Sequence, residues 1–245
     1  RRVTINPNQT WHPSEPESQA FDYKKLSADT GYLYLAHFDV PPKDFERQIE
    51  ATFQQIRQNA VTNLIIDIRD NPGGNTDTVT LLSRYLASKP FKMLSSMQEK
   101  LHKDNRGLFN YKGNIGEILS NEWNEIEQPI DSDNRFKGNT YLLIGGASYS
   151  AAIVFATTMQ DNQMATLIGE ETGGYANQSA QGNLFNLPHS HLRAYITTRL
   201  LVRPNGDTSR SHVIPDYPAD ISIESIRQEK DLALDMAMSL IERSK

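Results

Sequence analysis

The sequence predicts an α/β fold in which a largely parallel sheet is covered by helices. Apolar, strand-like runs alternate with amphipathic helical segments, and glycine-bearing turns follow two of those runs. A chain of 245 residues is long enough to bury a full core. The content of 38% hydrophobic and 22% charged residues is that of an ordinary soluble globular protein.

The first organised element is expected to begin at Gly31. Its residues alternate in a pattern typical of a strand that is covered on both faces, with Tyr32, Tyr34, Ala36 and Phe38 against Leu33, Leu35 and His37. Residues 1–28 are polar, contain several prolines and show no sustained period, so we interpret them as a linker or the tail of a preceding module. The core domain is therefore expected over residues 29–245.

The helices and strands that follow are predicted from spacing. The first helix is expected from an apolar stripe formed by Phe45, Ile49, Phe53 and Ile56. A buried strand, Leu64–Ile68, follows it, and a second helix is expected over 76–88. Later elements are a short strand at 165–169, a strand pair near 183–203 and a closing helix with Leu234, Met238 and Ile241. The polar segment 92–138 is predicted to be a lid-like insertion that faces the substrate.

Charge and composition exclude several classes of function. The net charge of −5 and the absence of a long Lys/Arg cluster argue against a nucleic-acid or anionic-membrane surface. Cysteine is absent, which excludes disulfides, thiolate metal sites and a cysteine nucleophile. No apolar run approaches the roughly 18 residues of a membrane span, and no signal peptide is visible. No His/Asp/Glu cluster has ligand spacing, so neither a metal nor a cofactor is expected.

The turn around Ser150 is the most informative stretch. The residues Gly145–Ala152 (GGASYSAA) follow the apolar run Tyr141–Ile144 and lead into a helical segment that ends near Met159. A serine at a tight strand-to-helix junction is held at the mouth of the sheet, where the free N–H groups of the next helix can stabilise negative charge. The pattern predicts covalent chemistry at Ser150.

A second glycine turn, Asn71-Pro72-Gly73-Gly74, follows the strand around Ile65. Turns at the carboxyl ends of strands in one α/β sheet tend to lie at the same edge, where ligands bind. Backbone N–H groups of Gly73 or Gly74 and of Ala151 could then converge on one oxygen as an oxyanion hole.

Three segments in order carry a family resemblance: IIDIRDNPGG (65–74), residues 145–174 and Val213-Ile214-Pro215-Asp216. Together they resemble the C-terminal processing and tricorn-core family of serine peptidases, over about residues 31–240. The resemblance implies a crotonase-like (ClpP-like) protease core with a PDZ-like module upstream. It also implies that Ser150 is the nucleophile, that Gly73, Gly74 and Ala151 form the oxyanion hole, and that Ser148 is a turn residue.

Two departures from the family pattern bear on the general base. Tyr175 occupies the place of the lysine used by the processing-protease branch, so the chain is similar to the tricorn-like branch, which uses a histidine upstream of the PDZ-like module. Ser209 stands where that branch has a glutamate. The chain begins at Arg1 without an initiator Met, so we expect it to be a fragment of a longer protein. The general base is then expected upstream, and the fragment by itself should have little activity. The resemblance also implies that the protein is located in the cell envelope or outside the cell.

Histidines within the chain are the other candidates for the base. His212 directly precedes the Val213–Asp216 motif and is retained as a candidate, whereas His37 on a core strand is interpreted as a satisfied structural residue. The others fall in polar or loop segments: His12, His102, His189 and His191. Asp67 and Arg69 are predicted to share a face and pair within the sheet.

Three functions remain open. The first is a serine endopeptidase that cleaves peptides or unstructured protein segments through an acyl-enzyme at Ser150. The second is a non-catalytic binding module of the same fold for apolar ligands or peptides. The third, an acyl-CoA enzyme with the same two-amide hole for a thioester enolate, has no use for a nucleophile-type serine turn.

Overall fold

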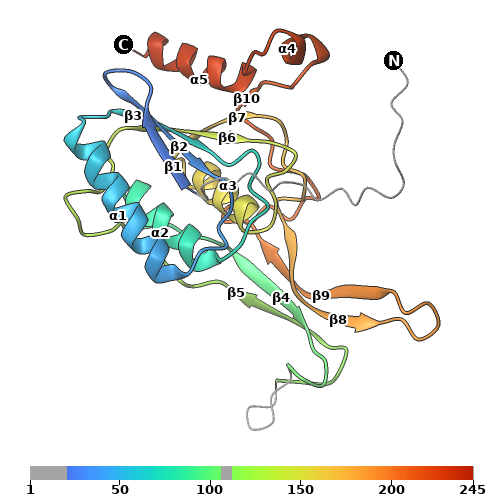
Figure 1. Cartoon of the computed structure of the whole chain (residues 1–245). Coiled ribbons are helices and arrows are strands. Elements are labelled where there is room, and N and C mark those ends of the chain that lie inside the picture. Colours follow the sequence, from blue (N-terminus) through green and yellow to red (C-terminus); the bar gives the residue numbers. More distant parts are fainter. Residues whose placement is uncertain (1–20, 106–111, 245) are drawn as a thin grey trace, which may run out of the picture.

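The computed structural model describes residues 21–105 and 112–244, and its centre is a six-stranded sheet (Figure 1). The strand order is β1-β2-β3-β6-β7-β10, and every neighbouring pair is parallel except β1 with β2. The strands are β1 (Phe21–Lys25), β2 (Thr30–Leu35), β3 (Asn63–Asp67), β6 (Asn139–Ile144), β7 (Thr166–Gly169) and β10 (Tyr217–Pro218). The predicted α/β fold is confirmed.

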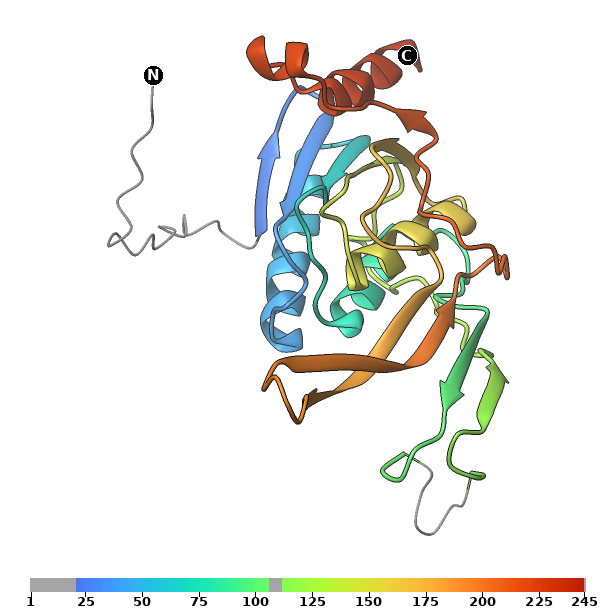
Figure 2. The same cartoon turned by 90° about the vertical axis from the view of Figure 1, so that its right-hand side faces the viewer.

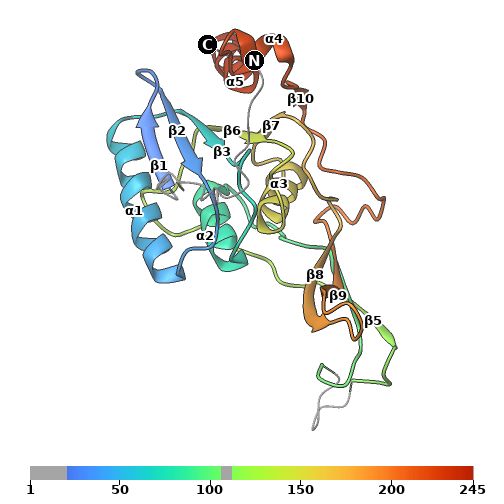
Figure 3. The ribbon, with the colours of Figure 1, turned by 45° about the vertical axis from the view of Figure 1, so that its right-hand side comes forward.

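Helices cover both faces of this sheet (Figure 3). One face carries α1 (Pro42–Gln58), α2 (Thr76–Leu86) and α3 (Ala151–Asp161), and the other carries α5 (Leu232–Arg243), which follows the short α4 (Ile223–Arg227). The predicted apolar stripe of α1 is buried along its whole length and packs on Leu33 and Leu35 of β2. Tyr32 of the same strand packs against the cluster under α5, so β2 is covered on both faces as predicted.

A second, four-stranded antiparallel sheet extends from this body (Figure 2). Its order is β5-β4-β9-β8, formed by β4 (Ser96–Lys100), β5 (Ile118–Glu122), β8 (Gln178–Asn186) and β9 (Arg193–Val202). The segment 92–138 is therefore no free insertion: it supplies β4 and β5, and Met93, Leu94 and Phe136 join the main core. Its sequence is polar because β5 is largely exposed and β4 is only partly buried. Whether it moves as a lid stays a prediction.

The predicted linker over 1–28 is wrong for its last part, because residues 21–25 form β1 and pair with β2 in register Phe21↔Leu35. Phe21 reaches the core and meets Phe45 of α1 edge to face, with ring centroids 6.0 Å apart. Residues 1–20 lie outside the described part of the chain. None of the helices in the described part is long and apolar enough to cross a membrane.

An ion-pair network fastens α5 to the sheet. Arg69 donates to Asp67 at 2.6 Å, which confirms the predicted pairing, and also to Asp231 at 2.6 and 2.7 Å. Asp231 is the N-cap of α5 and accepts from the Leu234 N–H at 3.1 Å. Burial alone would raise the pKa of Asp231, but the hydrogen bonds from Arg69 outweigh it and hold that pKa below its ordinary value. The charge of Asp231 therefore stabilises the folded state.

We expect Asp231→Asn to lower the free energy of unfolding by about 1 kcal/mol at pH 7, because Asn keeps the N-cap but loses the ion pair. The Asp231 side chain is 37% exposed, so solvent screening limits the effect. A depressed pKa contributes stability above the ordinary value of 3.8, and this stability is lost as the pH falls through the folded-state pKa. The difference from wild type should therefore close in acid. Urea unfolding at several pH values measures it, and Asp235→Asn, on the exposed side of α5, is the control.

Candidate active site

Ser150 sits at the N-terminus of α3 in a strained backbone conformation. Its φ of 53° and ψ of −120° lie in a region that serine rarely adopts. The residue is exposed, and its side chain makes no capping hydrogen bond to the helix that it begins. A sharp strand-to-helix turn that holds an exposed serine in a strained conformation is the geometry of a nucleophile elbow.

Ser148, two residues earlier, has the opposite environment. It is fully buried, and its hydroxyl donates to the Ile68 carbonyl at 2.7 Å and accepts from the Gly145 N–H at 3.1 Å. The hydroxyl of Ser148 is thus committed to closing the turn after β6. Of the two serines, only Ser150 has a hydroxyl that is open to a substrate.

The two glycine turns meet, as expected from their places at the ends of neighbouring parallel strands. The Tyr149 N–H donates to the Asn71 carbonyl at 3.0 Å, which joins the serine turn to the turn after β3. Gly73 has a φ of 105° and packs directly against Ser150: a Cβ at position 73 would lie 2.7 Å from the Ser150 Cβ and 2.8 Å from the Ala151 nitrogen. The close approach requires glycine at this position.

The three amides predicted for an oxyanion hole differ in availability. The Ala151 N–H has no partner within the described residues, as is usual for the first turn of a helix. The Gly73 N–H donates to the Asn71 side-chain oxygen at 2.8 Å, whereas no acceptor is found for the Gly74 N–H in the same part of the chain. Gly74 and Ala151 thus have free donors, and Gly73 would first have to release Asn71.

Asn71 is a residue of the site that the sequence did not single out. It is fully buried, and its amide group donates to the Leu35 carbonyl at 3.0 Å while its oxygen accepts from Gly73. It therefore fixes the glycine turn to the end of β2. The signal was present in the Asn-Pro-Gly-Gly turn, where asparagine commonly bonds the backbone two residues on.

His212 lies close to the site but is held by the loop 172–176. Its Nδ1 is 2.7 Å from the Thr172 carbonyl oxygen, and its ring packs on Tyr175 with centroids 4.8 Å apart. The backbones of Tyr175 and His212 form an isolated β-bridge. The contacts found for His212 in the described chain do not include Ser150, so its role as a base stays a prediction.

Ser209, at the position of the family's glutamate, bonds within its own loop. Its hydroxyl donates to Asp207 at 2.8 Å and lies 3.2 Å from the Ser211 hydroxyl. Hydrogen bonds from the Ser209 backbone and side chain lower the pKa of Asp207, which is fully exposed. Asp207 is thus engaged with Ser209, and the hydrogen bonds found for His212 in the described chain include none to an acidic group of this loop.

His37 differs from its predicted role as a satisfied structural histidine. Its Nδ1 is buried and has no hydrogen-bond partner within the described chain, so that interpretation is wrong. The residue follows β2 and lines an open hollow of about 650 Å³ beside the glycine turn, together with Asp39, Pro72, Gly73, Gly74 and Asn75. The Phe38 N–H, next to it, donates to the Gly73 carbonyl at 2.7 Å. By contrast, His189 and His191 are exposed in the β8–β9 loop, as predicted.

The arrangement of the two glycine turns lies within a segment that matches a known protein family. The family model described as peptidase family S41 matches residues 29–219. The chain belongs to peptidase family S41. The match includes both glycine turns and the His212 loop of this S41 chain.

Individual relatives of the S41 chain are distant. It is 23% identical over 222 residues to a carboxyl-terminal-processing protease of Picosynechococcus, which covers 89% of this chain and 46% of the relative. A tail-specific protease of Haemophilus influenzae is 25% identical over 177 residues, covering 70% of this chain and 22% of the relative. The chain spans about half the length, or less, of the curated relatives that it matches.

Solved structures agree on the fold of the S41 chain. A Parabacteroides merdae protein described as a peptidase superimposes with a TM-score of 0.68 at 22% identity, covering 90% of this chain and 64% of the other. Mature CPAF superimposes with a TM-score of 0.65 at 19% identity, covering 81% and 48%. At these identities the likeness concerns the fold alone.

Proposed function

We propose that the protein is a serine peptidase that cleaves peptides or unstructured protein segments through an acyl-enzyme at Ser150. The observation that supports this most strongly is the exposed, strained Ser150 packed against Gly73, with the free Ala151 N–H beside it. Membership of peptidase family S41 supports the same reaction type.

The reaction needs the following steps. The Ser150 Oγ attacks the scissile carbonyl carbon and its proton passes to a general base. The carbonyl oxygen, now negative, accepts hydrogen bonds from the Ala151 N–H and from Gly74 or Gly73, and loss of one such donor typically costs about 100-fold to 1000-fold in rate. The C–N bond then breaks, the amine leaves with a proton, and water hydrolyses the acyl group from Ser150.

A histidine upstream of this chain is our proposal for the base. Tyr175 stands in the place of a lysine, and its ring contacts both His212 and the guanidinium of Arg210, which lies 4.7 Å from the ring centroid. His212 is engaged with Thr172, and the acidic residue of its loop, Asp207, is bonded to Ser209. Both observations favour a base from outside these residues.

The finer assignments of fold and place accompany this function. We propose that the sheet and its helices form a crotonase-like core, because two adjacent turns present backbone amides at one edge of a mainly parallel sheet. We also propose a site of action in the cell envelope or outside the cell. A structural relative with a TM-score of 0.58 is described as a lipoprotein from Streptococcus agalactiae.

The test is active-site labelling of the full-length protein with a fluorophosphonate probe, followed by peptide mass spectrometry. We expect one adduct, on the peptide that contains Ser150, because only an activated serine reacts at an appreciable rate. Heat-denatured protein is the control and should not react. Absence of an adduct, or an adduct confined to other residues, would instead favour a binding module of the same fold.

A further inference from the structure

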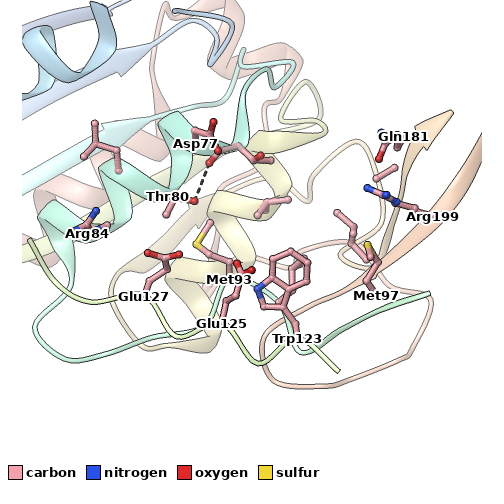
Figure 4. Close-up of a pocket in the computed structure, with 16 residues that line it drawn as sticks. Asp77, Thr80, Arg84, Met93, Met97, Trp123, Glu125, Glu127, Gln181 and Arg199 are labelled. Carbon is pink, nitrogen blue, oxygen red and sulfur yellow. Dashed lines mark hydrogen bonds between the residues drawn. The ribbon is translucent and has the colours of Figure 1, made fainter. Parts of the chain in front are cut away.

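The elements that form the serine site also enclose a large cavity (Figure 4). It measures about 800 Å³ and lies between α2, the segments 93–97 and 123–127, α3 and the second sheet. Thr76 and Asp77 line it directly after the glycine turn. Its wall also includes Val154, whose N–H donates to the Ser150 carbonyl at 3.2 Å in the first turn of α3.

The second sheet closes the cavity from the other side. Gln178, at the start of β8, donates to the Ser150 carbonyl at 2.9 Å, and Ala180 and Gln181 of the same strand line the cavity. The start of α2 after the glycine turn, the first turn of α3 and the start of β8 thus each form part of the cavity wall. Thr76 follows Gly74 by two residues and Val154 follows Ala151 by three, so a peptide whose carbonyl oxygen accepts from the Gly74 and Ala151 N–H groups can extend the side chain of that residue toward the cavity.

The interior of the cavity is apolar. Met93, Leu94 and Val154 are buried in its floor, and Trp123 stands at its centre in the view of Figure 4. The Trp123 segment is held by backbone bonds: its N–H donates to the Ser95 carbonyl at 2.8 Å, and Phe91 and Glu127 exchange bonds at 2.9 and 3.0 Å. Because the lining is apolar and its wall is held in place, the cavity favours a long aliphatic side chain over water.

The charges on the lining are unbalanced. Asp77, Glu125 and Glu127 line the cavity, and none of these carboxylates forms an ion pair within the described residues. Of the two arginines on the lining, Arg199 pairs at 3.0 Å with Glu99, a carboxylate that also pairs with Lys112 at 3.5 Å, and Arg84 donates to the Gln128 carbonyl at 3.0 Å. The lining thus carries three carboxylates and two arginines, a net charge of −1, and this charge favours a positively charged occupant.

We infer that this cavity is the specificity pocket for the substrate residue whose carbonyl Ser150 attacks, and that it selects lysine or arginine. The aliphatic stem of such a side chain packs on Met93 and Trp123 while its charged end reaches Glu125 and Glu127. This inference rests on the proposed function, since it places the pocket relative to an acyl group on Ser150.

The test uses binding, which needs no general base. In the chain with Trp11→Phe, Trp123 is the single tryptophan of the sequence and reports occupancy of the cavity. Product-like peptides Ac-Ala-Ala-Lys, Ac-Ala-Ala-norleucine and Ac-Ala-Ala-Glu, each with a free carboxylate, are titrated against its fluorescence. We expect the lysine peptide to bind about five-fold more tightly than the norleucine peptide, as is typical of a partly exposed ion pair, and the glutamate peptide to bind most weakly.

Variants separate charge from shape. Glu125→Gln with Glu127→Gln should make the lysine and norleucine peptides equal, whereas Glu46→Gln with Glu50→Gln, on exposed positions of α1, should preserve the preference. Equal or tighter binding of norleucine by the unaltered pocket would overturn the charge selection. No response of Trp123 to any peptide, when the fluorophosphonate still labels Ser150 in the full-length protein, would overturn the pocket but leave the peptidase standing. Failure of that labelling would overturn the proposed function itself.

Discussion

Replacement of Ser150 by alanine is expected to lower peptide hydrolysis by the full-length protein at least about a thousand-fold, because the acyl-enzyme can no longer form. The substitution removes an exposed hydroxyl without a capping bond, so the melting temperature should stay within about 1 °C of wild type. Hydrolysis of a quenched fluorescent, unstructured peptide measures the first effect and circular dichroism the second.

Ser148→Ala is the matched comparison, because it changes the same side chain two residues away. It leaves the buried Gly145 N–H without its partner and removes one of the two hydrogen bonds to the Ile68 carbonyl, which keeps the Asn71 N–H at 3.0 Å, so it should lower the free energy of unfolding by about 1–3 kcal/mol. Fully folded Ser148→Ala should still react with the fluorophosphonate. Loss of labelling in folded Ser148→Ala, with labelling retained in Ser150→Ala, would reverse the assignment of the nucleophile.

The parts of the fold that the sequence predicts well are those with a local period. The spacing of the stripe from Phe45 to Ile56 and the apolar run at Leu64–Ile68 both predict burial, and the two elements occur there as α1 (Pro42–Gln58) and β3 (Asn63–Asp67). The pairing of the two glycine turns also follows from local features, since parallel neighbouring strands place their ends at one edge.

The parts that escaped prediction depend on partners far along the chain. β4 is polar in sequence, and its place in a sheet is fixed by β9, about 100 residues later. Asp231 lies 162 residues from Arg69, and no spacing indicates that it completes the ion pair. The missing hydrogen-bond partner of the buried His37 Nδ1 likewise could not be predicted. An alternating strand pattern indicates which face of the sheet a side chain lies on, but not which residues surround it there.

Gly74→Ala is expected to be the most destabilising single substitution in the glycine turn. Gly74 has a φ of 139°, and a Cβ there would lie 2.2 Å from the Asp39 nitrogen and 2.3 Å from the Phe38 carbonyl carbon. Both are backbone atoms, which cannot rotate away as a side chain could. Strain and steric overlap together should cost at least about 3 kcal/mol of unfolding free energy, or a fall in melting temperature of about 10 °C.

Gly146→Ala provides the control, because a Cβ at position 146 meets no atom within 4 Å. It lies in the serine turn and should change the free energy of unfolding by no more than about 0.5 kcal/mol. If thermal unfolding found the two variants equally stable, the contact between Gly74 and the Phe38–Asp39 backbone would not be as tight as the structure has it. That contact places the Gly74 N–H beside the end of β2 and Gly73 against Ser150, so the same glycines that allow the fold to close also set where an oxyanion can be held.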